Sequence, residues 1–183
     1  SVCYEANEAF YIPVAHKERT ELKKDIVLKK LKPILEDPSI KKVGQNIKYD
    51  FIIFKNNGIE LSSVEDTMLL SYTLDAGNNR HNMDTLSELH LGHKTISYKD
   101  LVGSGKKQLN FADVDIKPAT EYAAEDADIT LRLYEVLSER VSKEKLERVY
   151  EEFEKPMIKI LSRLEMNGIK VDDAYLKKLS KKF

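Results

Sequence analysis

The sequence predicts an α/β domain, with helices packed around a sheet of short strands. Short β-rich segments alternate with amphipathic helical segments along the chain, an order typical of helices that cover a sheet. The chain of 183 residues, 42% of them hydrophobic, is long enough for one buried core with a short appended element. No apolar run approaches the roughly 20 residues that cross a bilayer, so we expect no membrane partner.

The first half of the chain predicts a hairpin followed by alternating helices and strands. Asp37-Pro38 stops the first helix, and Asn46 is suited to the N-cap of the second, which ends near Asn57-Gly58. Apolar residues three and four positions apart mark the helical segments. The predicted elements are a hairpin of residues 1–5 and 9–15, a helix over 22–35, a strand over 40–43, a helix over 46–57 and a helix from 67 to 74.

The second half of the chain is predicted to be mainly helical. Pro118 suits the first turn of a long helix, and Asn167-Gly168 caps the last one. Glycine-rich and asparagine-rich loops separate the earlier segments. The predicted elements are a short helix over 83–89, a helix from 118 to 141 and a helix from about 143 to 167, with loops at 75–80 and 103–105.

Charge and cysteine content restrict the partners and the compartment. Lys and Arg number 30 against 31 Asp and Glu, a net charge of −1, so a nucleic-acid partner would be held locally rather than by overall positive charge. The single cysteine, Cys3, excludes an internal disulfide and suggests the reducing cytoplasm. The sequence carries no signal for an oligomeric state.

The predicted helix from Pro118 carries a phenol and a carboxylate among apolar residues. Its residues at alternating spacings of three and four share one face, namely Ala119, Tyr122, Asp126, Ile129, Leu133 and Val136. Burying an ionised carboxylate costs several kcal/mol unless it is paired or bound to a metal, so Asp126 needs a cation. A structural ion pair for Asp126, with Tyr122 as a core residue, stays open as the other interpretation.

A second carboxylate lies in the helix predicted over 46–57. Ile47, Asp50 and Phe54 share a stripe, so we expect Asp50 to point toward the core, one turn into a helix whose N-terminal end favours negative charge. Asp50 also fits a structural role as a cap of its own first turn. Two convergent acids would offer the oxygen ligands of Mg²⁺, which in pairs promotes phosphodiester cleavage.

Five strings of the sequence resemble the 3′-5′ proofreading exonuclease domain of bacterial DNA polymerase I, a family A DNA polymerase. Residues 44–50 read GQNIKYD and resemble its second motif, and residues 122–130 read YAAEDADIT and resemble its third. Residues 66–72 (DTMLLSY) and 80–86 (RHNMDTL) match the family in order and spacing. Residues 161–172 (LSRLEMNGIKVD) resemble the helix that opens the polymerase domain.

The resemblance implies a ribonuclease-H-like (DnaQ-like) exonuclease fold, a mixed sheet with flanking helices, and two Mg²⁺ or Mn²⁺ ions in the complete domain. Asp126 would be a direct metal ligand, Asp50 would hold the second metal through water, and Tyr122 would orient the attacking water. The implied substrate is a single-stranded or frayed DNA 3′ end, with the rest of DNA polymerase I in cis and a bacterial cytoplasmic location. Contacts to that DNA are implied for Gln45, Asn46, Tyr49, Arg80 and Tyr98.

One part of the family pattern does not occur in the sequence. The first motif is an Asp-x-Glu on the first, central strand, which adds two metal ligands, and we expect it upstream of Ser1. The chain would then contain an exonuclease domain over 1–150 without its central strand, and the start of the polymerase domain over 151–183. We expect weak metal binding, little or no exonuclease activity from this chain alone, and a gap that is closed by rearrangement or filled by another segment.

Two other functions stay open. Ribonuclease D-type enzymes use the same Tyr-x-x-x-Asp arrangement on the same fold, so the substrate could be RNA, although the polymerase-like segment from Pro156 to Asp172 argues against it. The chain could also be a noncatalytic nucleic-acid-binding or structural module. Activity of the parent protein with and without Asp126→Ala separates these functions.

Overall fold

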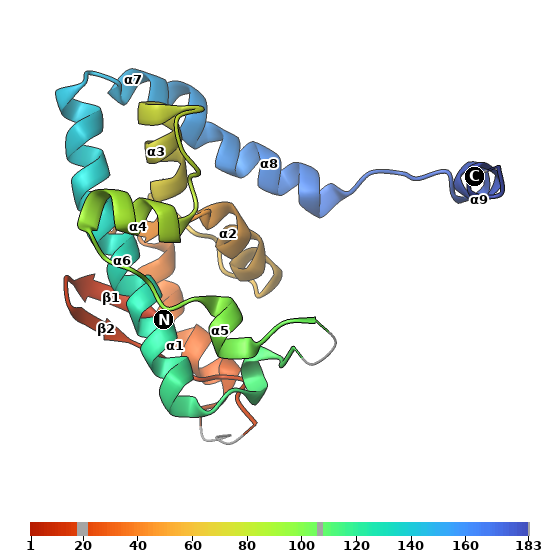
Figure 1. Ribbon diagram of the computed structural model, residues 1–183, viewed down its shortest axis with the longest axis horizontal. Coiled ribbons are helices and arrows are strands. Elements are labelled where there is room, and N and C mark those ends of the chain that lie inside the picture. The colour runs from red at the N-terminus through yellow and green to blue at the C-terminus, as the bar shows by residue number, and fades with distance from the viewer. Residues whose placement is uncertain (18–21, 106–107, 183) are drawn as a thin grey trace.

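Helix α6 (Ile116–Lys143) is the element against which most of the fold packs (Figure 1). The computed structural model describes residues 1–17, 22–105 and 108–182. Buried side chains recur along α6 mainly at spacings of three and four residues, as expected of a helix with one face in a core. They are Ala119, Ala123, Ile129, Thr130, Leu133, Leu137 and Val141.

An N-terminal hairpin packs against α6. Strands β1 (Val2–Glu5) and β2 (Glu8–Phe10) pair in antiparallel fashion, with Val2 opposite Phe10, which confirms the predicted hairpin. The second strand is shorter than predicted. Pro13 lies in the part that was expected to continue it, and proline has no N–H group to donate to a strand ladder.

Two short strands, one before and one after α2, form a parallel pair. Strands β3 (Lys42–Gly44) and β4 (Val64–Asp66) pair so that Gly44 lies opposite Asp66, and β3 contacts α6. Within the described ranges, the hairpin and this pair are two separate two-stranded sheets. The fold is therefore α/β with small sheets and flanking helices.

The other helices follow the predicted order, with small shifts at their ends. The five-residue α5 and the C-terminal α9 were not predicted. The helix predicted from about 143 to 167 begins later, at Glu147, because the chain turns at Lys145, whose φ of +59° cannot continue a helix. It then runs to Asn167 and contains a π turn. The elements are α1 (Lys24–Glu36), α2 (Ile47–Asn56), α3 (Thr67–Asp75), α4 (Met83–Leu91), α5 (Tyr98–Val102), the 3-10 turn η2 (Phe111–Asp113), α7 (Glu147–Val149), the π turn η3 (Tyr150–Glu154), α8 (Lys155–Asn167) and α9 (Asp173–Ser180).

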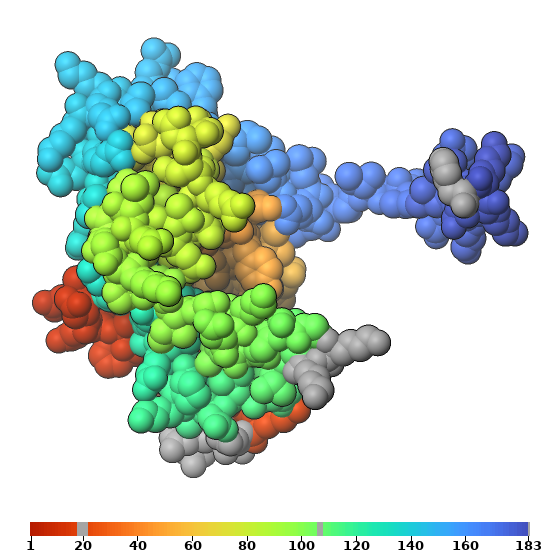
Figure 2. Space-filling view, viewed as in Figure 1, coloured from red at the N-terminus to blue at the C-terminus, as the bar shows by residue number. Residues whose placement is uncertain are grey.

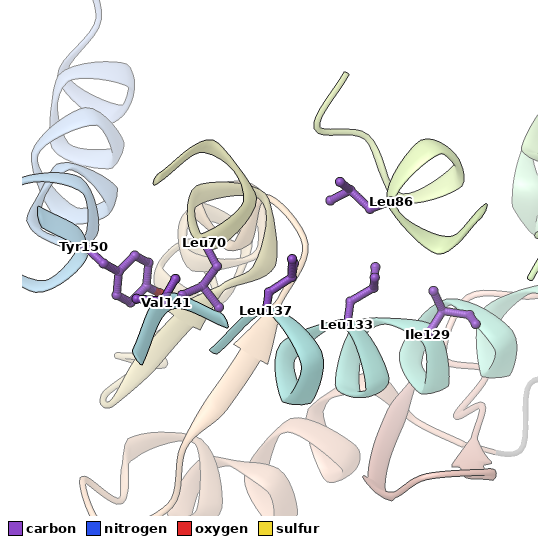
Figure 3. Packing of buried hydrophobic residues seen from close by; sticks show 7 residues of the cluster. All are labelled: Leu70, Leu86, Ile129, Leu133, Leu137, Val141 and Tyr150. Carbon is purple, nitrogen blue, oxygen red and sulfur yellow. The ribbon is translucent and has the colours of Figure 1, made fainter. Parts of the chain in front are cut away.

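The main hydrophobic core joins α3, α4, α6 and the π turn η3 (Figure 3). Its buried side chains are Leu70, Leu86, Ile129, Leu133, Leu137, Val141 and Tyr150. A second cluster lies between α2, β4 and α8, and its members are Ile47, Phe51, Leu61, Val64 and Ile158. The two clusters hold α6 and α2, the helices that carry the predicted catalytic residues, against the other helices of the fold.

The C-terminal segment leaves the body of the fold at the end of α8, and α9 stands apart from it (Figure 2). No residue of α9 is buried. Tyr150 and Ile158 nevertheless belong to the two core clusters, so packing continues across the boundary predicted at residue 150, which itself stays a prediction. In the part of the chain that the structure describes, no helix is both long enough and apolar enough to span a membrane.

Candidate active site

Tyr122 and Asp126 lie at the margin of the buried face of α6. Both side chains are half-buried, whereas Ala119 and Ala123 of the same helix are fully buried. The prediction that the two residues share the inward-facing side of this helix is therefore confirmed, although they lie at the edge of the core and not within it. One helical turn separates them, which brings the phenol next to the carboxylate.

Burial changes the titration of both groups. Burial raises the pKa of the Asp126 carboxyl to about 6, a hydrogen bond from the Tyr122 hydroxyl opposes the shift, and the charges of Glu125 and Asp84 add to it. The pKa of the Tyr122 phenol is raised, first by burial and then by the Asp126 carboxylate. The phenol is thus a proton donor at neutral pH, beside a carboxylate that no cationic side chain of the described residues balances.

The raised pKa of Asp126 makes folding stability depend on pH. Between the ordinary value of 3.8 and the folded value of about 6, the folded chain holds a proton that the unfolded chain has released, so the free energy of unfolding falls as pH rises through this window. The full penalty is on the order of 2 kcal/mol above that window, after allowance for water at the half-buried group, and it vanishes below it. We expect Asp126→Asn to stabilise the metal-free chain by on the order of 1–2 kcal/mol at about pH 8 and to have no effect near pH 4.

Urea unfolding in EDTA at the two pH values measures this difference. Asp115→Asn is the matched control, because Asp115 is an exposed aspartate at the start of the same helix and its side chain makes no capping hydrogen bond. A stabilisation that is equal at both pH values would show that the change does not arise from the Asp126 charge.

Asp50 lies on the solvent side of α2, so the prediction that it points toward the core is wrong. Ile47 and Phe51 occupy the buried face of this helix, and Asp50 precedes Phe51 by one position, which rotates it by about 100° from that residue. Its side chain is exposed to water, yet enough protein surrounds the carboxyl for desolvation to raise its pKa. Asp50 is therefore a carboxylate that an ion from solvent can reach.

Asp50 and Asp126 both lie near the first residue of the chain, Ser1. Two carboxylates from α2 and α6 thus approach the same point of the fold. Neither here nor elsewhere in the described ranges is a group of three or more His, Cys, Asp or Glu side chains arranged to hold an ion. The donor set fits a divalent cation in kind, but it supplies only two carboxylates.

The turn from β3 into α2 depends on residues that were predicted to contact DNA. Asn46 occupies the N-cap position of α2, as predicted, with φ of +57°, but its side chain makes no capping hydrogen bond. The Gln45 amide is held inside the fold, since it donates to the carbonyl oxygen of His81 at 2.8 Å and accepts from Thr67. At Gly44, any Cβ atom would lie 2.8 Å from the Ile47 side chain, so the tight turn requires glycine.

The other predicted DNA contacts are exposed. Tyr49 is 67% exposed, and Arg80 also faces solvent. Tyr98, 45% exposed, lies with its ring centroid 5.7 Å from that of Tyr122. The structure thus brings Tyr98 next to the candidate catalytic tyrosine.

Sequence reasoning gave no role to several residues beside the site. Phe111 lies 6.0 Å from Tyr122 and 6.3 Å from Tyr98, ring centroid to ring centroid. Asp84 raises the pKa of both Tyr122 and Asp126 through its charge, although other causes are larger. Asp84 belongs to the RHNMDTL string, which could have marked it as a site residue. No sequence pattern pointed to Phe111.

Comparison with known proteins defines the class of this site. Residues 1–142 match the family described as 3′-5′ exonuclease. The fold, with its tyrosine and aspartate one turn apart on α6, is that of a 3′-5′ exonuclease domain.

Relatives among curated proteins identify the family more closely. DNA polymerase I of Rhizobium leguminosarum is 48% identical over 183 residues, which cover 94% of this chain and 18% of that protein. DNA polymerase I of Pseudomonas aeruginosa is 45% identical over 179 residues, which cover 94% of this chain and 20% of that protein. The chain belongs to the DNA polymerase I family of 3′-5′ exonuclease domains, a family of nucleases in DNA replication and repair. It spans about a fifth of the length of these relatives.

Solved structures share the fold. Pol1 of M. smegmatis, solved with DNA primer-template and dNTP, has a TM-score of 0.67 at 21% identity, and the match covers 89% of this chain and 25% of that one. NrnC of Brucella melitensis has a TM-score of 0.62 at 23% identity, and the match covers 78% of this chain and 66% of that one. A second NrnC structure, bound to pGG, has a TM-score of 0.62 at 20% identity.

Proposed function

We propose that this domain removes nucleotides from a single-stranded or frayed 3′ end of DNA, as the proofreading exonuclease of a DNA polymerase I. The observation that carries the proposal is the half-buried pair of Tyr122 and Asp126, one turn apart on α6, with Asp50 in the first turn of α2. Asp126 is half-buried, has a raised pKa and has no cationic side-chain partner among the described residues, and a metal ion would stabilise such a group. The family supplies the reaction, hydrolysis of the 3′-terminal phosphodiester.

Mg²⁺ or Mn²⁺ fits these residues in the chemistry of its ligands, since hard divalent cations prefer carboxylate oxygens. Asp126 would be a direct ligand of one ion, and Asp50 would hold a second ion through water. When bound, such ions make a water molecule easier to deprotonate and neutralise charge that develops on the phosphate. The protonated Tyr122 would orient the attacking water by a hydrogen bond, and Asp126 would fix the phenol from the other side.

Exposed side chains around the site suit a single strand. Tyr49 and Tyr98 present aromatic rings on which unpaired bases could stack, and such stacking tolerates any sequence. Arg80 would pair with the phosphate backbone. Asn46 keeps a free side chain at the start of α2, whereas Gln45 would act by shaping the turn because its amide is already hydrogen bonded.

A further strand would complete the site and the sheet, in a ribonuclease-H-like arrangement. β1 pairs only with β2, and β3 only with β4, within the described part of the chain, so each pair has an edge with unused backbone groups. We propose that a strand bearing Asp-x-Glu lies between β1 and β3 in the parent protein and joins the two pairs into one mixed sheet. It would add the two carboxylates that the cation site requires.

The rest of a DNA polymerase I would follow in cis, in the bacterial cytoplasm. The relatives contain this domain within a much longer polymerase, which supports a partner domain on the same chain. The exonuclease domain would occupy residues 1–150 and the polymerase domain would begin within 151–183. The substrate would be a primer end delivered from the polymerase domain.

An exoribonuclease is the second candidate function. The fold of NrnC, one structure of which is bound to pGG, matches this chain at a TM-score of 0.62. The polymerase relatives and the polymerase-like segment from Pro156 to Asp172 favour DNA.

Substrate choice tests the proposal. The purified parent polymerase, supplied with Mg²⁺ and no nucleotides, is expected to shorten a single-stranded DNA oligonucleotide from its 3′ end, and to act on an RNA oligonucleotide of the same sequence at least about tenfold more slowly. A DNA oligonucleotide with a blocked 3′ end controls for endonuclease activity. Preference for RNA would favour the exoribonuclease, and no cleavage of either substrate would leave a noncatalytic module.

A further inference from the structure

A single buried carboxylate, that of Asp66, closes the start of two helices. Asp66 is 2% exposed at the end of β4. Its two oxygens accept hydrogen bonds from the backbone N–H groups of Asn46 and Ile47, each at 3.0 Å, and Oδ1 also accepts from the N–H of Met68 at 2.9 Å. The first two donors open α2 and the third opens α3.

This arrangement replaces the cap that α2 does not supply itself. The first N–H groups of a helix have no partner within it, and the Asn46 side chain makes no capping bond. Asp66 reaches these groups from the neighbouring strand, where it lies opposite Gly44. The direction in which α2 leaves the sheet is therefore fixed by Asp66, and Asp50 lies in the first turn of that helix.

Tyr150 holds Asp66 in place from the opposite side. The buried Tyr150 hydroxyl accepts a hydrogen bond from the Asp66 N–H at 3.0 Å and donates one to Oε2 of Glu65 at 2.9 Å. Lys155 donates to Oε1 of the same glutamate at 2.8 Å. Asp66 is thus hydrogen bonded to the π turn, and its neighbour Glu65 to the first residue of α8.

We propose that Asp66, seated by Tyr150, is a positioning residue for the exonuclease site. It acts by holding the start of α2, which carries Asp50, at the end of β3, the strand that contacts α6, and the segment after residue 142 takes part in the site through Tyr150. The inference rests on the proposed function, because it concerns the position of the carboxylate proposed to serve the second ion. It adds to that function two residues that never contact substrate or ion.

Two variants of the parent polymerase test the inference. In Asp66→Asn, an amide N–H₂ replaces one acceptor oxygen, so at least one N–H of the helix starts loses its partner. Tyr150→Phe is milder, since it removes the hydroxyl and keeps the ring in the core. Tyr175→Phe is its matched control, because Tyr175 is 60% exposed on α9 and the chemical change is the same. The assay is the dependence of 3′-5′ exonuclease rate on Mn²⁺ concentration, well below the unfolding midpoint of each variant, with polymerase activity recorded in parallel.

A positioning role predicts that both variants need more Mn²⁺. The concentration for half-maximal exonuclease rate should rise about 10–100-fold in Asp66→Asn and by a smaller factor in Tyr150→Phe, with polymerase activity unchanged. A purely structural role would lower the unfolding midpoint and leave this concentration unchanged, which would overturn the inference. If Asp66→Asn fails to fold, Tyr150→Phe decides between the two results. Asp126→Ala, measured alongside, distinguishes failure of the positioning role from failure of the proposed function. If Asp126→Ala loses exonuclease activity, the proposed function is upheld whatever the result for Asp66→Asn. If Asp126→Ala keeps full activity, both proposals are refuted.

Discussion

Replacing Asp126 by alanine is expected to reduce the 3′-5′ exonuclease rate of the parent polymerase by about a thousandfold or more. The residue is proposed to hold a metal ion directly and also contacts the Tyr122 phenol, so its loss removes both a ligand and the partner that fixes the phenol. Loss of about 4 kcal/mol of charge stabilisation corresponds to a factor of that size. Single-turnover degradation of a single-stranded DNA measures the rate.

The variant should leave nucleotide incorporation unchanged, which the same preparation can report. Asp115→Ala is the matched control, since it removes an exposed carboxylate from the start of the same helix and should keep the exonuclease rate. An Asp126→Ala enzyme that still degrades DNA at a tenth of the original rate would rule out a direct ligand role.

Joining the proposed strand with Asp-x-Glu to this chain is expected to have the second largest effect. The 183-residue chain alone should bind Mn²⁺ weakly and degrade single-stranded DNA slowly or not at all, because Asp50 and Asp126 supply only two carboxylates. Extension by the parent's own upstream segment, if it carries Asp-x-Glu, should add two ligands. We expect Mn²⁺ affinity to increase at least about a hundredfold, and exonuclease activity to appear.

Isothermal titration with Mn²⁺ and an oligonucleotide assay on the two proteins measure this gain. An extended chain in which the Asp-x-Glu is changed to Asn-x-Gln separates the effect of the carboxylates from that of the completed sheet. That control should gain thermal stability without gaining metal affinity. Robust metal-dependent activity of the unextended chain would show that two carboxylates suffice, and the proposed strand would lose its catalytic purpose.

Composition and residue spacing correctly predicted the elements that form through contacts between residues close in sequence. The hairpin and the buried stripe of α6 follow from β-rich composition and from helical spacing, and both are present. The pair of Tyr122 and Asp126 was found because four residues make about one helical turn. Of the remaining candidates, Tyr49 lies on the predicted α2 and Tyr98 on the unpredicted α5, whereas the others lie in loops, namely Gln45, Asn46 and Arg80.

Tertiary contacts decided what the sequence could not. Asn46 has the side chain of an N-cap residue, but the cap comes from Asp66, 20 residues later, across a strand pair that no local pattern reveals. Asp50 is exposed because it lies beside, and not on, the stripe of Ile47 and Phe51 that packs with Ile158. The amide of Gln45 is bonded to groups of residues 67 and 81, which are distant in sequence.

The π turn at Tyr150–Glu154 sets the phase of everything that follows it. In a regular α-helix of 3.6 residues per turn, Tyr150 and Ile158 would be about 80° apart around the axis. The wider turn removes much of this offset, and both side chains are buried, one against β4 and the other against α2. If the same eight residues followed regular pitch, Ile158 would turn by about 80° away from the face that carries Tyr150. The widened turn therefore lets one continuous helix bury a side chain against β4 and another against α2.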